Sequence, residues 1–114
     1  MRTFFSFIFL ATSCFATNAL GALPDKFYKV SEGIYRSAQP TASDYQDLKR
    51  MGIKTVLTLN NDQRTLAAET RTAGNLGIKL IARPMSAFST PRDSDVNADL
   101  EDLHNPDNYP ILIH

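Results

Sequence analysis

The stretch GIKTVLTLNND, residues 52–62, contains the segment that decides the fold class. Apart from Lys54, every residue from 53 to 59 is aliphatic or a threonine, and these residue types favour extended backbone. A nearly continuous run of this kind is typical of a strand that is buried on both faces, as in a parallel sheet. The polar residues 60–62 then predict a turn at the carboxyl end of the strand.

The segment before this strand predicts a helix over residues 42–51. Thr41 is a suitable N-cap residue and Asp44 follows it three positions later, while Gly52 suits the C′ position at the other end. One face of this helix is apolar and carries Tyr45, Leu48 and Met51.

Six further elements are predicted along the rest of the chain. They are strands at 27–30, 34–37, 78–82 and 111–114, and helices at 64–76 and 94–103. The alternation of strand and helix predicts an α/β fold with a mostly parallel central sheet flanked by helices. In open sheets of this kind the functional site lies beyond the carboxyl ends of the strands.

The composition narrows the functional classes. The chain has 114 residues, with 12 basic and 12 acidic residues, so one domain at most is expected and no charge excess points to nucleic acid. One Cys and two His exclude a four-ligand zinc site and an internal disulfide. Neither a metal nor an organic cofactor is implied.

Residues 1–22 are predicted to be a signal peptide. Arg2 provides a basic start, residues 4–15 form the apolar region, and Ala19 or Ala22 can precede the cleavage site. A helix of this apolar length spans about 18 Å, which is too short for a bilayer core of about 30 Å. We therefore expect export to the periplasm or secretion, with no stable membrane span.

A lipoprotein anchored through Cys14 is the alternative to this interpretation. It has less support, because residues 11–13 lack the usual apolar residue three positions before the cysteine.

Four stretches of the sequence together resemble the cysteine-based tyrosine and dual-specificity phosphatases, particularly the small exported bacterial ones. They are IYRSAQP at 34–40, GIKTVLTL at 52–59, RPMS at 83–86 and YPILIH at 109–114. The resemblance covers residues 23–114 and implies the N-terminal part of a phosphatase domain. It also implies hydrolysis of phosphate monoesters on a phosphorylated protein or a small molecule.

The last of these stretches implies a role for His114. In the family, the final strand leads into a loop of the form His-Cys-x-x-Gly-x-x-Arg, whose cysteine thiolate attacks the phosphate. Backbone amides, a helix N-terminus and the arginine bind the phosphate. His114 matches the signature histidine, which helps to orient the loop and to tune the thiolate.

The sequence ends at His114. We therefore expect it to lack the Cys-x-x-Gly-x-x-Arg loop and to be inactive alone, as a truncated gene product or an incomplete sequence record. The alternative hypothesis is a secreted, non-enzymatic α/β module that binds a partner through the loops at its strand ends. Incompleteness would also leave the apolar residues 111–113 half covered and the domain marginally stable.

The resemblance further implies an aspartate general acid on the segment after Pro84. Asp93 or Asp95 lies in the appropriate region, and no motif distinguishes them. The alternative interpretation is that both offset the dipole of the helix that begins there.

Other chemically active residue types have ordinary explanations. Ser37 lacks the Gly-x-Ser-x-Gly frame of a nucleophile elbow, and His104 suits a helix C-terminus. Arg36 is either a partner of the site or a solvated strand residue. The acidic residues of 93–107 do not have the spacing of a calcium loop, so they predict a solvated helix face.

Overall fold

The computed structural model describes residues 23–86 and 89–114. The predicted signal peptide, residues 1–22 with Cys14, lies outside the described residues. In the two described ranges, no helix is both long and apolar enough to cross a bilayer.

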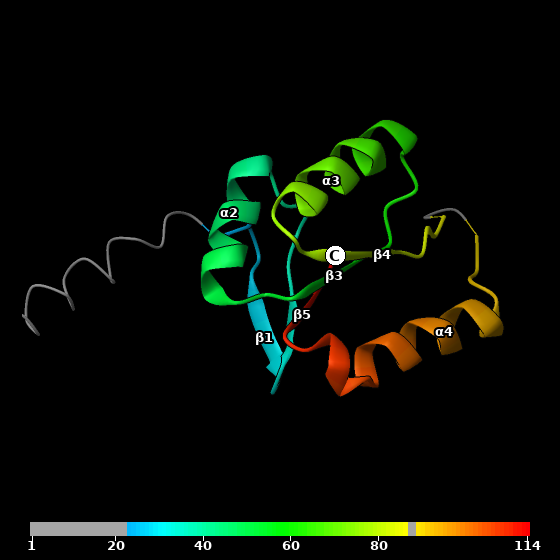
Figure 1. The fold of residues 1–114 in the computed structure, drawn as a ribbon. Helices are drawn as coiled ribbons and strands as arrows, with labels where there is room; N and C mark the ends of the chain where they lie inside the picture. Colours follow the sequence, from blue (N-terminus) through cyan, green and yellow to red (C-terminus); the bar gives the residue numbers. More distant parts are fainter. Residues whose placement is uncertain (1–22, 87–88) are drawn as a thin grey trace, which may run out of the picture.

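All the elements predicted from the sequence are present, and their ends differ from the predictions by at most two residues (Figure 1). A short 3₁₀ helix, η1, was not predicted. The order is β1 (Tyr28–Ser31), β2 (Ile34–Arg36), α2 (Ala42–Met51), β3 (Thr55–Thr58), α3 (Gln63–Asn75), β4 (Lys79–Ala82), α4 (Asp93–His104), η1 (Pro106–Asn108) and β5 (Ile111–Ile113).

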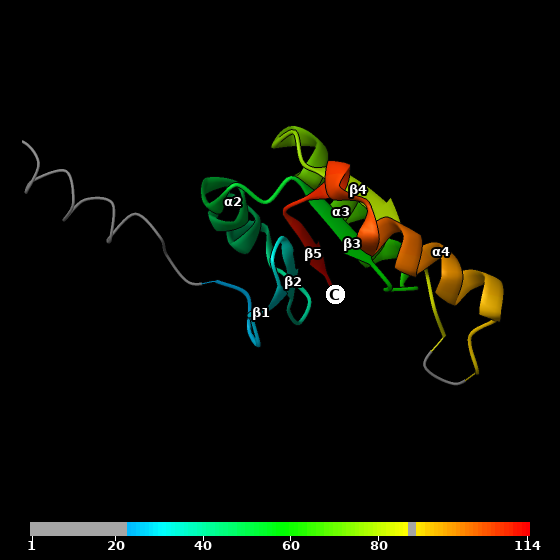
Figure 2. The same cartoon turned by 90° about the horizontal axis from the view of Figure 1, so that it is seen from below.

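The strands form one mixed sheet in the order β1-β2-β5-β3-β4. The pairs β2–β5, β5–β3 and β3–β4 are parallel, while β1 and β2 form an antiparallel hairpin. Helices α2 and α3 cover one face of the sheet and α4 lies on the other (Figures 1 and 2). The predicted α/β class with a mostly parallel sheet is therefore confirmed.

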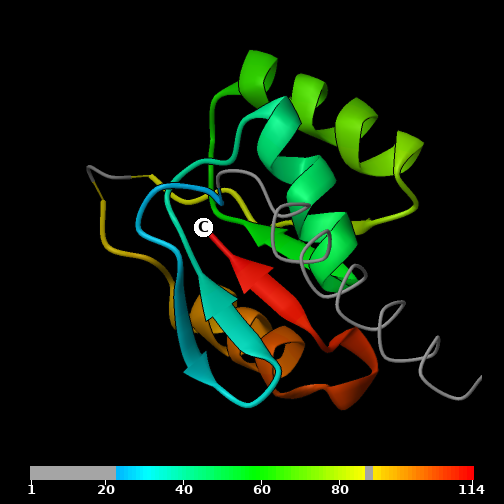
Figure 3. The ribbon, with the colours of Figure 1, turned by 90° about the vertical axis from the view of Figure 1, so that its left-hand side faces the viewer.

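The strand β5 occupies the centre of this sheet, between β2 and β3 (Figure 3). Ile111 is in register with Ile34 on one side and with Thr55 on the other. Ile111 and Leu112 are completely buried, and Ile113 is partly exposed. The expectation that β5 would be half covered is thus wrong for its first two residues, because helices lie on both faces of the sheet (Figures 1 and 2).

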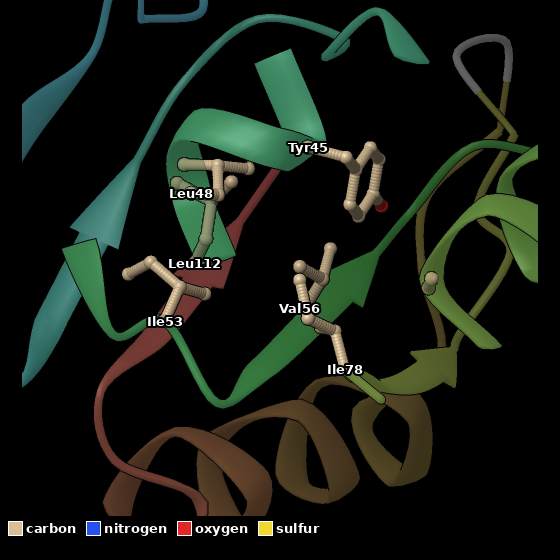
Figure 4. Packing of buried hydrophobic residues seen from close by; sticks show 7 residues of the cluster. Tyr45, Leu48, Ile53, Val56, Ile78 and Leu112 are labelled. Carbon is tan, nitrogen blue, oxygen red and sulfur yellow. The ribbon is translucent and has the colours of Figure 1, made fainter. Parts of the chain in front are cut away.

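The main hydrophobic core lies between the sheet and the pair α2–α3. Leu112 and Val56 point from β5 and β3 toward Tyr45 and Leu48 of α2 (Figure 4). These four residues are at most 1% exposed. Burying one side chain of this size contributes about 1.5–3 kcal/mol. This core therefore fixes α2 against the central strand.

The ends of α2 are set by the predicted residues. The Thr41 hydroxyl accepts a hydrogen bond from the Asp44 backbone N–H at 3.1 Å, and the Asp44 carboxylate accepts one from the Thr41 N–H at 2.8 Å. This reciprocal pair is a capping box. Gly52 ends the helix in the left-handed conformation, with φ of 95°.

Gly33 connects the β1–β2 hairpin to β5. Its φ of 81° lies in the left-handed region, and its carbonyl accepts a hydrogen bond of 2.8 Å from the Ile111 N–H. A Cβ atom placed on Gly33 would lie 2.5 Å from Cδ2 of Tyr109. Both the backbone conformation and the close packing therefore require glycine at this turn.

We predict that Gly33→Ala destabilises the chain by about 2–4 kcal/mol, because it combines an unfavourable backbone conformation with a steric clash. Gly74→Ala is the matched control, since a Cβ atom on Gly74 in α3 meets nothing within 4 Å. That control should stabilise the helix by about 0.5–1 kcal/mol. Urea unfolding followed by circular dichroism measures both changes. Equal midpoints for the two variants would contradict the assigned role of Gly33.

Candidate active site

The carboxyl ends of the parallel strands meet at one edge of the sheet, and His114 lies there, directly after β5. The His114 N–H donates to the Leu57 carbonyl at 3.0 Å, and the His114 carbonyl accepts from the Leu59 N–H at 2.8 Å. These two bonds continue the β3–β5 ladder past the last residue of β5. The backbone of the predicted signature histidine is therefore fixed beside β3.

The side chain of His114 is buried against a carboxylate that the sequence analysis did not identify. Its Nε2 atom lies 2.5 Å from Oε2 of Glu69, and the two side chains are only 3% and 2% exposed. The hydroxyl of Tyr45 donates a hydrogen bond to the same Oε2 atom. We call these three residues the Tyr45–Glu69–His114 cluster, and it joins α2, α3 and the end of β5.

Glu69 occupies this place because it lies on the inward face of α3. Ala73, one turn later, is fully buried, and Leu66 and Leu76 on the same face are partly buried. The spacing of residues 66, 69, 73 and 76 is that of one helix face. A glutamate that interrupts an otherwise apolar helix face was the signal in the sequence that could have identified it.

The cluster determines the ionisation of its acidic groups. Burial alone would raise the pKa of Glu69. The hydrogen bonds from His114 and Tyr45, together with the charge of His114, outweigh burial and hold this pKa below its ordinary value of 4.5. Burial, and then the hydrogen bond to Glu69, raise the pKa of Tyr45. At neutral pH, Glu69 is therefore ionised and Tyr45 is a protonated donor.

The second oxygen of the Glu69 carboxylate is less well satisfied. Oε1 is buried, and no group among residues 23–86 and 89–114 makes a hydrogen bond of normal geometry to it. The side-chain amide of Gln39 contributes only a smaller lowering of the Glu69 pKa. Gln39, Tyr45 and Glu69 also line a small cavity of about 140 Å³ between α2 and α3.

The RPMS stretch runs along the same edge of the sheet. The Arg83 N–H donates to the Thr58 carbonyl at 2.9 Å, and the Met85 N–H donates to the Leu59 carbonyl at 2.9 Å. The Arg83 side chain turns toward α4, where its Nε lies 3.0 Å from Oδ2 of Asp102. The stretch thus connects the end of β4 to the start of the segment that leads into α4.

The structure places Asp93 and Asp95 in the first turn of α4, and their surroundings differ. Asp95 forms two contacts with the Arg92 guanidinium, at 3.0 and 3.3 Å, and lines a cavity of about 290 Å³ that Pro84 also borders. Asp93 is exposed and does not line that cavity. Neither aspartate is the N-cap residue, which is Arg92. Both remain placed to offset the helix dipole.

Arg36, Ser37 and His104 have other surroundings. The Arg36 guanidinium lies over the ring of Tyr28, 4.9 Å from its centroid, and the Ser37 hydroxyl donates to the Ala38 carbonyl. His104 is exposed in the last turn of α4.

One acidic residue of α4 departs from the predicted solvated face. Asp99 is buried, and burial raises its pKa, whereas the charge of Arg83 acts in the opposite direction. In the part of the chain that the structure describes, no three His, Cys, Asp or Glu side chains are grouped as a metal site requires.

A model of the tyrosine phosphatase family matches residues 22–114. A search among curated proteins gives no significant match. Among solved structures, the core catalytic domain of the PP-IP phosphatase SIW14 from S. cerevisiae is 30% identical, with a TM-score of 0.73. The alignment covers 82% of this chain and 57% of that one.

Two bacterial structures are also similar. TpbA from P. aeruginosa, solved in complex with pTyr, is 27% identical over 77% of this chain and 51% of its own, with a TM-score of 0.63. A phosphatase-like protein from Shewanella putrefaciens is 17% identical, over 80% of this chain and 61% of its own, and its TM-score of 0.70 shows a shared fold. The chain thus spans somewhat more than half the length of these solved proteins.

We predict that Glu69→Gln lowers the free energy of unfolding at pH 7 by about 1.5–3 kcal/mol, because hydrogen bonds to a buried charged group are lost or weakened. The pKa of Glu69 is depressed by folding, so its stabilisation is complete above the ordinary value of 4.5 and is lost as the pH falls below it. The difference between the two proteins should therefore shrink as the pH falls below 4.5. Urea unfolding at several pH values measures it.

Glu101→Gln is the control for this experiment, because Glu101 is an exposed glutamate on α4. It should leave the stability within about 0.5 kcal/mol at each pH. A Glu69→Gln effect that does not change with pH would show that the charge of Glu69 does not stabilise the cluster.

Proposed function

The chain belongs to the tyrosine phosphatase family, whose model matches residues 22–114, and on this basis we propose that it forms the upstream part of an exported phosphate monoester hydrolase. The observation that carries the proposal is the position of His114. It follows the central strand at the edge of the sheet where the carboxyl ends of the strands meet, and a buried carboxylate holds its ring. In this family a cysteine follows that histidine.

The proposed chemistry transfers the phosphoryl group twice. The thiolate of a cysteine directly after the histidine attacks phosphorus, the bond from phosphorus to the leaving oxygen breaks, and an aspartic acid gives that oxygen its proton. Water then attacks the phosphocysteine, which releases inorganic phosphate and restores the thiolate. The only cysteine of the chain is Cys14, in the predicted signal peptide. We therefore propose that the 114-residue chain is inactive by itself.

The proposed role of the described residues is to position this chemistry. The β3–β5 ladder and Glu69 set the place and direction of the signature histidine. For the general acid we favour Asp95 over Asp93, because Asp95 is the one that lines a cavity beside Pro84.

The substrate class is proposed from the chemistry of the family. SIW14 is a PP-IP phosphatase and TpbA has been solved with pTyr, so both a phosphorylated small molecule and a phosphorylated protein are candidate substrates. We further propose export to the periplasm or beyond, which the basic start and short apolar region of residues 1–22 support. A mature N-terminus directly after Ala19 or Ala22 would test the export.

Activity tests the proposal directly. We expect a polypeptide in which a Cys-x-x-Gly-x-x-Arg loop follows His114 to hydrolyse an aryl phosphate. The 114-residue chain and a cysteine-to-serine variant of the loop should show no turnover above the buffer blank. Turnover by the 114-residue chain would refute its proposed inactivity. Failure of the longer polypeptide, if folded, would favour the alternative of a non-enzymatic binding module.

A second experiment identifies the general acid in that longer polypeptide. We expect Asp95→Asn to lower kcat by about 10²–10⁴-fold on a phosphate ester with a poor leaving group, because such esters require protonation of the leaving oxygen. Asp93→Asn is the matched control and should leave kcat nearly unchanged. The opposite result would assign the role to Asp93, and equal, small effects would exclude both aspartates.

A further inference from the structure

We propose that Glu69 is a positioning residue of the phosphatase site. It holds the His114 imidazole in one orientation and in the tautomer that carries its proton on Nε2. This inference rests on the proposed function for its catalytic consequence, but its structural part stands independently.

The first support is that His114 is fixed at both its backbone and its ring. Two backbone hydrogen bonds join it to Leu57 and Leu59 of the neighbouring chain segment. The ring has a third attachment, the contact from Nε2 to Glu69. With the side chain 3% exposed, water does not compete for that nitrogen. Very little rotational freedom therefore remains to the imidazole.

The second support is the chemistry of the pair. An ionised carboxylate only accepts hydrogen bonds, so the nitrogen that faces it must carry a proton. When the ring is neutral, this makes Nδ1 the unprotonated nitrogen. Nδ1 can then accept a hydrogen bond from the phosphatase loop that follows the strand. The partner of one ring nitrogen decides the state of the other.

The third support is the free-energy cost of burying a charged Glu69. A charged side chain inside an apolar helix face is unfavourable unless it is paired and hydrogen-bonded. If position 69 were needed only for packing, an aliphatic residue would be sufficient there. Leu66 on the same face of α3 and Leu76 directly after the helix are examples. Glu69 also keeps one buried oxygen, Oε1, without a regular hydrogen bond within the described ranges. Buried carboxylates whose pKa is shifted by specific partners, as the pKa of Glu69 is, are concentrated at functional sites.

Tyr45 completes the arrangement from the other side. Its hydroxyl donates to the same Oε2 atom that faces His114, and its ring is 1% exposed in the core between α2 and the sheet. The carboxylate is therefore oriented by a rigid donor on α2 and in turn orients the histidine. Tyr45 and the ring of His114 are linked through the shared Oε2 atom of Glu69.

The tautomer can be measured on the 114-residue chain by NMR after labelling of histidine with ¹⁵N. The chain contains only two histidines, and exposed His104 serves as an internal reference. When its ring is neutral, we expect His114 to show a slowly exchanging proton on Nε2 and no detectable Nδ1–H tautomer. Glu69→Gln should cause loss of this protected proton and a shift toward the tautomer mixture of His104. A mixture in the unmodified chain, or an unchanged His114 in the variant, would overturn the inference.

Tyr45→Phe provides a milder variant that keeps the charge of Glu69. It should retain the Nε2-protonated tautomer and raise the exchange rate of that proton about tenfold or more, because a hydrogen bond to a charged group is lost. An unchanged exchange rate would show that Tyr45 does not support the carboxylate. This variant also tests the inference if Glu69→Gln does not fold.

Activity separates this inference from the proposed function. In a polypeptide with the signature loop after His114, Glu69→Gln should lower kcat about 10–100-fold with little change in KM, as expected for a group that acts through another residue. An active parent with an equally active Glu69→Gln variant would refute the positioning role and leave the function intact. An inactive parent whose His114 shows the protected Nε2 proton would refute only the function.

Discussion

The two-sided pairing of β5 is the constraint on which the rest of the structure depends. Three residues, Ile111–Ile113, pair with β2 on one side and with β3 on the other. This short strand fixes the positions of the β1–β2 hairpin, of α2 and α3, and of the end of β3. Although the strand is short, burial of its side chains stabilises the fold, because Ile111 and Leu112 are completely buried. The strand also delivers His114 to the edge of the sheet.

This central strand places a histidine where a buried glutamate can reach it. The cluster of Tyr45, Glu69 and His114 joins three elements that are distant in sequence and adjacent in space. Removal of any member of the cluster is expected to lower the free energy of unfolding. A buried carboxylate without partners has lost its solvation, and no hydrogen bond or opposite charge compensates for that loss. The cluster therefore links the packing of α2 and α3 to the geometry of the site.

Family membership gives these observations their chemical meaning. A thiolate-dependent phosphatase requires its loop at the carboxyl edge of a parallel sheet, and β5 ends there. The segment between β4 and α4 brings Asp95 to the same end of the domain as Arg83 and Pro84. The chain spans only part of the length of its solved relatives, so the complete reaction is a proposal that its scaffold supports.

The sequence by itself determined the elements, their order and the family, because hydrophobic periodicity and capping residues such as Thr41 and Gly52 act within one turn or strand. It also singled out His114. Only the tertiary structure decided which groups His114 meets. Glu69 lies 45 positions earlier in the chain, and its contact with His114 depends on how α3 packs over the sheet (Figure 1). Likewise Asp93 and Asp95 are equivalent as residue types, and only the structure shows that Asp95 lines the cavity beside Pro84. Local patterns carry no information about such long-range contacts, since these arise from packing of whole elements.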